Sequence, residues 1–280
     1  MRNFCHGILA FLLLLSSATN LFSASPNEFC SGIMRSTFKI IGPNSIGTVF
    51  IMGRPNPNIP GTGYYVLITA AHVLEGIPTD IATLSLRVKE ENNYKRLFYQ
   101  INIRDKGNPI WVRHPIVDVA AMNVELPKGI DIELFSTDIL SNDDHIKNFE
   151  IHPGDELFVL GYPLNVESNP SGFPVLRSAR IANYPLIPTA SYPTFLLDLT
   201  IFPGNSGGPV ILDSRNRIYN GTTNVGSVNM VMGIISQELK NIEKIDAMNE
   251  TILKQHQMSL AVAIHASYIK NVLEMLPMPK

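Results

Sequence analysis

The sequence predicts an all-β protein, built as barrels or sandwiches and closed by one C-terminal helix. Short apolar or alternating runs are broken by turns rich in Pro, Gly and Asn, a pattern typical of antiparallel strands. The runs form two groups, before and after about residue 150, with no long helical pattern between them. Near the end, Ile269, Val272, Leu273 and Leu276 recur three and four residues apart. They form one apolar stripe and predict a helix.

The expected strands of the first group are GTVFIMG, GYYVLIT, TLSLRVK, RLFYQINI and the run WVRHPIVDVAAMNVEL. Those of the second group are DELFVLGYP, PVLRSARIAN, TFLLDLTI, GGPVILD, MVMGIIS and SLAVAIH. Loops such as RPNPNIPGTG separate them, with the residues that tight turns require. We therefore expect one domain over residues 26–280, with a first barrel at about 36–145, a second at about 146–265 and a helix at about 266–277.

Composition argues against two classes of partner. The chain has 280 residues, of which 45% are hydrophobic and 16% charged, enough for one large globular domain. With 22 basic and 24 acidic residues the net charge is -2. It therefore lacks the basic excess that drives binding to nucleic acid. No apolar run reaches the ~20 residues of a comfortable membrane span, so stable membrane insertion is not expected.

Residues 1–25 have the anatomy of an export signal. Arg2 precedes an apolar run at 7–15, and small residues follow. We expect removal of this segment and a secreted or periplasmic protein; an uncleaved N-terminal anchor is the alternative. Of the two cysteines, Cys5 lies within this segment and Cys30 just after it. The mature chain therefore cannot form an intramolecular disulfide.

The segment FPGNSGGPV (202–210) carries a candidate nucleophile, Ser206, between glycines. Gly204, Asn205 and Ser206 form the expected oxyanion loop, in which the N–H groups of Gly204 and Ser206 bind the oxyanion of a tetrahedral intermediate. An ordinary glycine-flanked turn is one alternative. The nucleophile elbow of α/β hydrolases is another, but it requires a helix after the serine. Pro209 and the β-branched run after it oppose that helix.

A general base is expected upstream, and His72 in LITAAHVLEG ends an apolar strand beside small residues. Asp118 stands among apolar neighbours, where a carboxylate needs a partner, and it could orient the histidine. Taken singly, both could be ordinary structural residues. His114 is a competitor for Asp118, four residues before it. The remaining histidines show no metal-ligand spacing, so we expect no metal and no cofactor.

Together, TAAH, DVA and GNSGGPV resemble the signature stretches of the trypsin-like serine peptidases. The resemblance extends through MGIIS (232–236), where Ser236 would hydrogen-bond Asp118, and spans roughly residues 36–275. It implies two orthogonal six-stranded β-barrels with the triad His72, Asp118 and Ser206 in the cleft between them. The animal members of the family carry an aspartate immediately before the nucleophile and several disulfides, whereas this chain has Asn205 there and no disulfide. In these two respects it resembles the bacterial, HtrA-like and glutamyl-endopeptidase-like branch. The 44 residues after Ser236 leave no room for a PDZ domain.

The resemblance implies a serine endopeptidase that acts on protein or peptide substrates through an acyl-enzyme. A catalytically inactive, protease-fold binding protein is the alternative. The family sets specificity largely six residues before the nucleophile, which here is the neutral Thr200. Thr200 argues against cleavage after Lys or Arg, and Ile235 replaces the histidine of the glutamate-cleaving relatives. Small or medium apolar residues before the scissile bond are therefore expected, with Thr200 and Ser236 contacting substrate. Because the neutral Asn205 offers no opposite charge to an inserted N-terminal ammonium, no activation cleavage is expected beyond signal removal.

Overall fold

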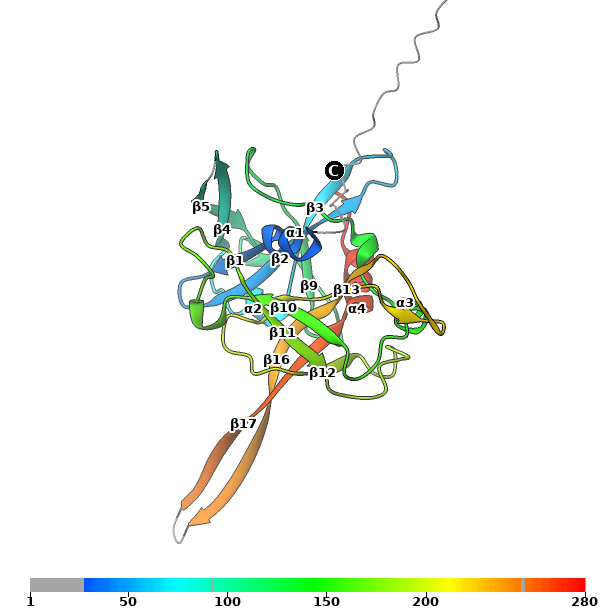
Figure 1. Ribbon diagram of the computed structural model, residues 1–280. Coiled ribbons are helices and arrows are strands. Elements are labelled where there is room, and N and C mark those ends of the chain that lie inside the picture. The colour runs from blue at the N-terminus through cyan, green and yellow to red at the C-terminus, as the bar shows by residue number, and fades with distance from the viewer. Residues whose placement is uncertain (1–27, 92, 248–249, 280) are drawn as a thin grey trace, which may run out of the picture.

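The computed structural model describes residues 28–91, 93–247 and 250–279. The expected signal segment 1–25, with Cys5, lies outside these described residues. Cys30 is a free cysteine whose Sγ donates to the Asp213 carboxylate at 3.1 Å. Most of the regular secondary structure in the described chain is β-strand, arranged in two halves with short helices between and around them (Figure 1).

The first half is a seven-stranded antiparallel sheet with the order β5-β4-β1-β2-β3-β9-β8. Its strands are β1 (Thr37–Ile41), β2 (Ile46–Pro55), β3 (Gly63–Thr69), β4 (Ile81–Glu90), β5 (Asn93–Asn102), β8 (Val112–Arg113) and β9 (Ala120–Asn123). Two short strands, β6 (Arg104–Asp105) and β7 (Asn108–Pro109), pair separately. The side chains of Phe38, Ile51, Leu67 and Leu84 are fully buried in the core of this half. This half therefore has one strand more in its sheet than the expected six.

The second half is a closed six-stranded barrel with the order β10-β11-β12-β17-β16-β13. Its strands are β10 (Glu156–Gly161), β11 (Val175–Ile181), β12 (Thr194–Asp198), β13 (Pro209–Arg215), β16 (Ser227–Ala247) and β17 (Glu250–His265). A small ribbon of β14 (Ile218–Tyr219) and β15 (Thr222–Thr223) follows β13. The all-β class, the closed barrel and the C-terminal helix confirm the predicted fold class. Strand β13, rather than a helix, follows Ser206, so the hydrolase elbow is wrong for this chain.

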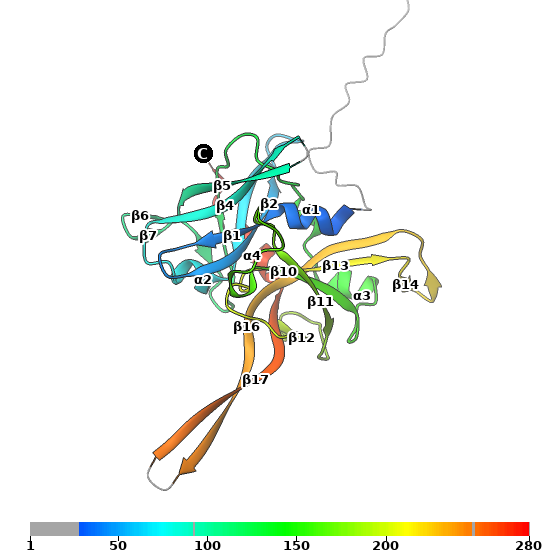
Figure 2. The ribbon, with the colours of Figure 1, turned by 60° about the vertical axis from the view of Figure 1, so that its left-hand side comes forward.

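Strands β16 and β17 continue beyond the barrel as a long two-stranded hairpin. Their pairing runs from Gly233 opposite His265 to Ala247 opposite Glu250. Figures 1 and 2 show this hairpin projecting away from the rest of the molecule. The sequence predicts strands only at 230–236 and 259–265, because the residues between them lack a regular alternation of apolar and polar side chains.

The helices lie at the ends and junctions of the strands. They are α1 (Phe29–Ser36), α2 (Ala71–Glu75), α3 (Asp143–Asn148) and α4 (Ala266–Met275), with 3-10 turns at η2 (Thr137–Ile139) and η3 (Pro163–Asn165). Helix α4 confirms the predicted C-terminal helix, and its Ile269 and Val272 are fully buried. Both join an apolar core that also contains Phe50 of β2 and Ile211 of β13. This shared core joins the two halves. None of the described helices is long and apolar enough to cross a membrane.

Candidate active site

His72 lies in the first turn of α2, directly after β3. The apolar β3 ends at Thr69, and Ala70 and Ala71 are fully buried beneath the turn. Small side chains here leave the imidazole exposed at the junction of the two halves, with 47% of its side chain accessible. Helix α2 ends at Glu75. The predicted strand-end position of His72 is therefore found.

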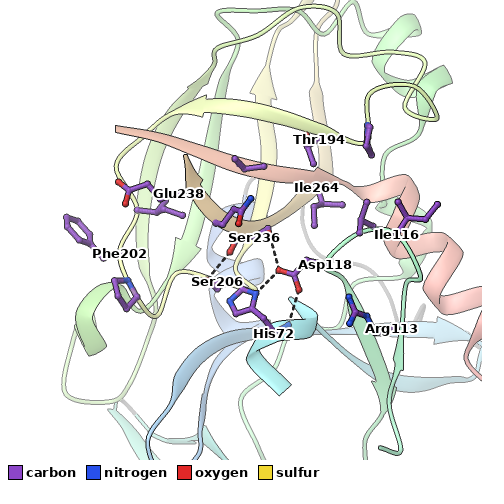
Figure 3. A pocket seen from close by; sticks show the side chains of 16 residues that line it. His72, Arg113, Ile116, Asp118, Thr194, Phe202, Ser206, Ser236, Glu238 and Ile264 are labelled. Carbon is purple, nitrogen blue, oxygen red and sulfur yellow. Dashed lines mark hydrogen bonds and ion pairs between the residues drawn. The ribbon is translucent and has the colours of Figure 1, made fainter. Parts of the chain in front are cut away.

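The structure brings Asp118 to His72 from the segment between β8 and β9. Asp118 Oδ1 accepts the backbone N–H of His72 at 2.9 Å, and Oδ2 lies 2.6 Å from Nδ1 of the ring. Ser236 Oγ donates to the same Oδ2 at 2.8 Å (Figure 3). The carboxylate is thus fixed from three directions, by one backbone group and two side chains. The expected Ser236–Asp118 bond is present.

These contacts shift the pKa values of both His72 and Asp118. The hydrogen bond to Asp118 raises the pKa of His72 above its ordinary 6.5, although burial opposes the rise. Burial alone would raise the pKa of Asp118, but its hydrogen bonds from the side chain and backbone of His72 outweigh burial and leave this pKa below its ordinary 3.8. The pair therefore favours an ionised Asp118 and a more basic imidazole, as a carboxylate-oriented histidine requires.

His114 does not compete for Asp118. Its Nδ1 accepts the backbone N–H groups of Ile116 and Val117, each at 3.2 Å. The ring packs edge-on against Tyr268 with centroids 5.0 Å apart, and burial lowers its pKa. His114 is therefore a buried structural histidine. Across the described ranges, no group of three or more His, Cys, Asp or Glu side chains could hold a metal ion.

The turn before Ser206 is held by backbone bonds that leave little room for side chains. Gly204 has φ +98°, and a Cβ on it would lie 2.1 Å from the Tyr162 carbonyl oxygen. The Gly204 carbonyl accepts Thr48 Oγ1 at 2.6 Å. The Pro203 carbonyl accepts the Leu164 N–H at 2.8 Å. In a trans peptide N–H and C=O point in opposite directions, so this bond turns the Gly204 N–H away from Leu164.

Asn205 stabilises the same turn from inside. Its side chain is buried, and its Oδ1 accepts the Phe202 N–H at 3.0 Å. Its backbone N–H donates to the Phe202 carbonyl, also at 3.0 Å. Asn205 thus closes the turn locally through both its side chain and its backbone.

Ser206 faces the same cavity as His72, but its hydroxyl makes a different contact. Ser206 Oγ donates to the Ser236 carbonyl at 3.1 Å (Figure 3). Among the bonds of the described residues, none joins Ser206 to His72. The Ser206 carbonyl accepts the Thr48 N–H at 2.9 Å, which fixes the backbone. The hydroxyl position therefore depends on the side-chain torsion alone.

A cleft of about 810 Å³ joins these groups. Much of its lining is apolar, including Ile201, Phe202, Val262 and Ile264. Glu238 also lines it, on the Phe202 side of Ser206 and away from Ile264 (Figure 3). Thr200 does not line the cleft; its carbonyl accepts a guanidinium N–H of Arg177 at 2.6 Å. Ser236 lines the cleft. The sequence does not single out Ile201 or Glu238, although they stand one residue after Thr200 and two residues after Ser236.

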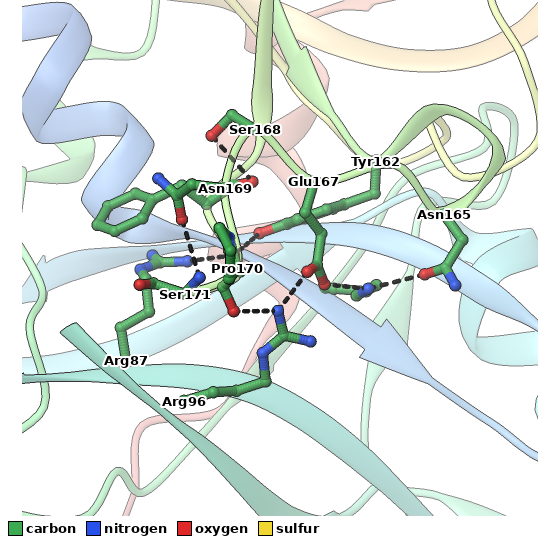
Figure 4. A network of polar contacts seen from close by, with 12 residues as sticks. Arg87, Arg96, Tyr162, Asn165, Glu167, Ser168, Asn169, Pro170 and Ser171 are labelled. Carbon is green, nitrogen blue, oxygen red and sulfur yellow. Dashed lines mark hydrogen bonds and ion pairs between the residues drawn. The ribbon is translucent and has the colours of Figure 1, made fainter.

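A polar network attaches the loop after β10 to the first sheet (Figure 4). Glu167 forms ion pairs with Lys39 of β1 and Arg96 of β5. Lys39 Nζ also donates to Asn165 Oδ1 at 2.7 Å. Asn165 adjoins Leu164, which holds the Pro203 carbonyl. The network therefore connects the first sheet to the turn before Ser206.

Arg87 and Tyr162 form the buried part of this network. The Arg87 guanidinium lies between the rings of Phe38 and Phe173, at 4.5 and 4.3 Å from their centroids. It donates to the Gly172 carbonyl at 3.0 Å, which also accepts Tyr162 OH at 3.1 Å. Burial raises the pKa of Tyr162 to about 12, so its phenol stays a donor. Both ends of the loop are thereby fixed to the sheet.

Comparison with known proteins gives similarity in structure only. No protein-family model matches the sequence, and no curated protein matches it. Among solved structures, the chain is similar to Rv3671c from M. tuberculosis H37Rv, in the inactive form of a serine-to-alanine mutant, with 18% identity and a TM-score of 0.46. The match covers 90% of this chain and 94% of that one. The inactive form of the Rv3671c protease matches with the same identity and coverage and a TM-score of 0.42.

Proposed function

We propose that this protein is a serine endopeptidase, with His72, Asp118 and Ser206 as its catalytic triad. The observation that carries the proposal is the Asp118 carboxylate, which bonds both His72 Nδ1 and Ser236 Oγ at the edge of the cleft where Ser206 lies. A carboxylate that orients a histidine beside a serine is the arrangement of acyl transfer. The order of the three residues along the chain supports the same conclusion.

In the proposed reaction, Ser206 Oγ attacks the substrate carbonyl carbon and its proton passes to Nε2 of His72. The tetrahedral intermediate then collapses as its C–N bond breaks, and the leaving amine takes the proton from Nε2. Water releases the acyl group by the same route. Asp118 fixes the ring so that Nδ1 carries a hydrogen and Nε2 is free to act as the base. No cofactor takes part.

The oxyanion is assigned to the N–H groups of Gly204 and Ser206, within the loop that Asn205 closes. Support comes from the Pro203 carbonyl, whose bond to the Leu164 N–H sets the direction of the Gly204 peptide. One such donor contributes about 3 kcal/mol to transition-state stabilisation. Attack also requires the Ser206 hydroxyl to turn from the Ser236 carbonyl toward His72, a rotation about one torsion.

The direct test is covalent labelling with a peptidyl organophosphonate. Ser206 should form a stable adduct, identified by mass spectrometry of the labelled peptide, and Ser206→Ala should form none. Ser214→Ala is a matched control, because Ser214 lies on β13 outside the cleft. Labelling of another residue, or equal labelling of both variants, would contradict the proposal.

A second candidate is a protease-fold binding protein without activity. The observation that favours it is the Ser206 hydroxyl bonded to the Ser236 carbonyl instead of His72. On this hypothesis the cleft holds a peptide without cleaving it. A peptide that binds but is never cleaved, together with the absence of phosphonate labelling, would identify this function.

We further propose that the protein is exported, secreted or periplasmic, and active once the signal is removed. The local bonds of Asn205 to the Phe202 backbone support independence from a free N-terminus, since they close the turn without an inserted ammonium. Active-site titration of protein beginning near Pro26, with and without a blocked extra residue, tests this. We expect equal titration, and a requirement for one particular free N-terminus would refute it.

A further inference from the structure

The cleft contains one acidic side chain whose position the reaction does not explain. Glu238 lies on β16 and lines the cleft together with Ser206 and Ser236. Its Oε1 is shielded from solvent and has no hydrogen-bond partner. No basic side chain in the described part of the chain forms an ion pair with it. A carboxylate oxygen without water or a partner is costly.

The surroundings of Glu238 indicate what would satisfy it. Phe202 lines the cleft on the same side of Ser206 as Glu238 (Figure 3). Val262 follows Ala261, which pairs with Glu238, and together with Ile201 it completes an apolar wall. Such a wall suits the aliphatic stem of a long side chain, and a carboxylate suits an ammonium or guanidinium at its tip. Arg113 also lines the cleft, but it bonds Glu75 at 2.7 Å and lies across the triad from Glu238 (Figure 3).

The spacing along β16 indicates which substrate residue would reach Glu238. Ser236, whose carbonyl contacts the Ser206 hydroxyl at 3.1 Å, stands two residues before Glu238. The pairing of β16 with β17 shifts register both before and after this stretch, so two residues span at most about 7 Å. A substrate residue whose carbonyl lies at Ser206 would need a side chain that reaches up to that distance. Lysine and arginine have four- or three-carbon stems with a charged tip and fit this requirement.

We propose that Glu238 makes this cleft select Lys or Arg immediately before the scissile bond. The inference rests on the proposed peptidase function and replaces the apolar preference drawn from Thr200. Thr200 lies outside the cleft lining, so its neutrality does not set the charge of the cleft. The negative charge comes instead from a different strand.

Hydrolysis of peptides that differ only in the residue before the scissile bond tests the proposal. Wild type should prefer Lys and Arg over Leu and Glu. Glu238→Gln should lose about 10- to 100-fold in kcat/KM for Lys and Arg, the range for losing a charged hydrogen-bond partner, with the Leu peptide changed less than threefold. Glu238→Asp should keep a preference for cations. Glu156→Gln removes an exposed acid outside the cleft and is the matched control.

A binding measurement separates this inference from the proposed reaction. Benzamidine, an aromatic amidinium, should bind Ser206→Ala protein, and calorimetry should show at least a tenfold weaker affinity when Glu238→Gln is added. The inference would be overturned if the wild type preferred Leu or Glu, or if Glu238→Gln kept the wild-type preference. It would also be overturned if benzamidine bound equally well with and without Glu238. Each of these results would leave the peptidase proposal intact. Absence of both hydrolysis and phosphonate labelling would overturn the peptidase proposal, and Glu238-dependent benzamidine binding would still support a cation-selective cleft.

Discussion

The variant Glu167→Gln tests whether the polar network below the Ser206 turn stabilises that turn. The Lys39 and Glu167 side chains are only 5% and 13% exposed. Loss of the carboxylate charge would leave the Lys39 ammonium buried without its counter-ion, a defect of about 3–5 kcal/mol in buried pairs. Arg96 is 25% exposed and keeps its hydrogen bond to the Pro170 carbonyl at 2.7 Å. Loss of its ion pair with Glu167 therefore adds little to the loss of stability. Because the amide still offers Lys39 an oxygen, we expect a loss of about 3 kcal/mol.

The same variant should reduce turnover more than substrate binding. Lys39 also holds Asn165, and the neighbouring Leu164 N–H holds the Pro203 carbonyl. Loosening this loop would let the Gly204 peptide turn, although it would not remove the N–H. Complete loss of an oxyanion donor costs about 10²–10³ in kcat. We expect a partial effect of about tenfold in kcat, with KM within twofold.

Urea unfolding and peptide hydrolysis measure the two effects. The double variant Lys39→Met with Glu167→Gln should recover at least half of the lost stability, because no unpaired ammonium remains. Glu90→Gln is the control: its exposed pair with Lys95, at 3.9 Å, should contribute less than about 1 kcal/mol. An unchanged free energy of unfolding in Glu167→Gln would refute the reasoning. So would a double variant whose losses of stability add, or a kinetic change confined to KM.

Three further predictions concern the triad and its turn. Ser206→Ala should lower peptide hydrolysis by about 10⁴-fold or more with an unchanged circular dichroism spectrum, and a residual rate above about a thousandth of wild type would contradict its role. Because Asp118 raises the pKa of His72, kcat/KM should fall as pH drops through a value above 6.5, and the His72 ring in Asp118→Asn should titrate at lower pH by NMR; an equal pKa in both proteins would argue against the pair. Asn205→Ala leaves the Phe202 N–H without its acceptor and should cost about 1–3 kcal/mol in urea unfolding, whereas an unchanged midpoint would show that the bond is dispensable.

Some parts of the site could be predicted from the sequence because the residues that define them are close together in the chain. The turn at Ser206 needs Gly204 for its positive φ and for the approach of the Tyr162 carbonyl, and such glycines are visible in a sequence. His72 follows an apolar strand and the two small residues Ala70 and Ala71, which is also a local pattern. The stripe in α4 predicted the helix for the same reason.

Other features depend on which segments pack together. The hairpin of β16 and β17 was missed because cross-strand pairing, rather than alternation, defines it. Helix α1 was missed because its eight residues give too short a pattern; Phe29 and Ile33 are buried by packing against the rest of the fold.

By itself the sequence determined the all-β class and the C-terminal helix, since each follows from residue types within a few positions of one another. It also named the three residues proposed as the triad, through three short stretches that are informative only when taken together. Only the tertiary structure decided that the Ser206 hydroxyl bonds the Ser236 carbonyl and that Thr200 lies outside the cleft lining. It also placed an unpartnered oxygen of Glu238 beside the apolar wall. Charge and shape in a cleft arise from strands far apart in the chain, and their relative positions are set by packing of the whole core.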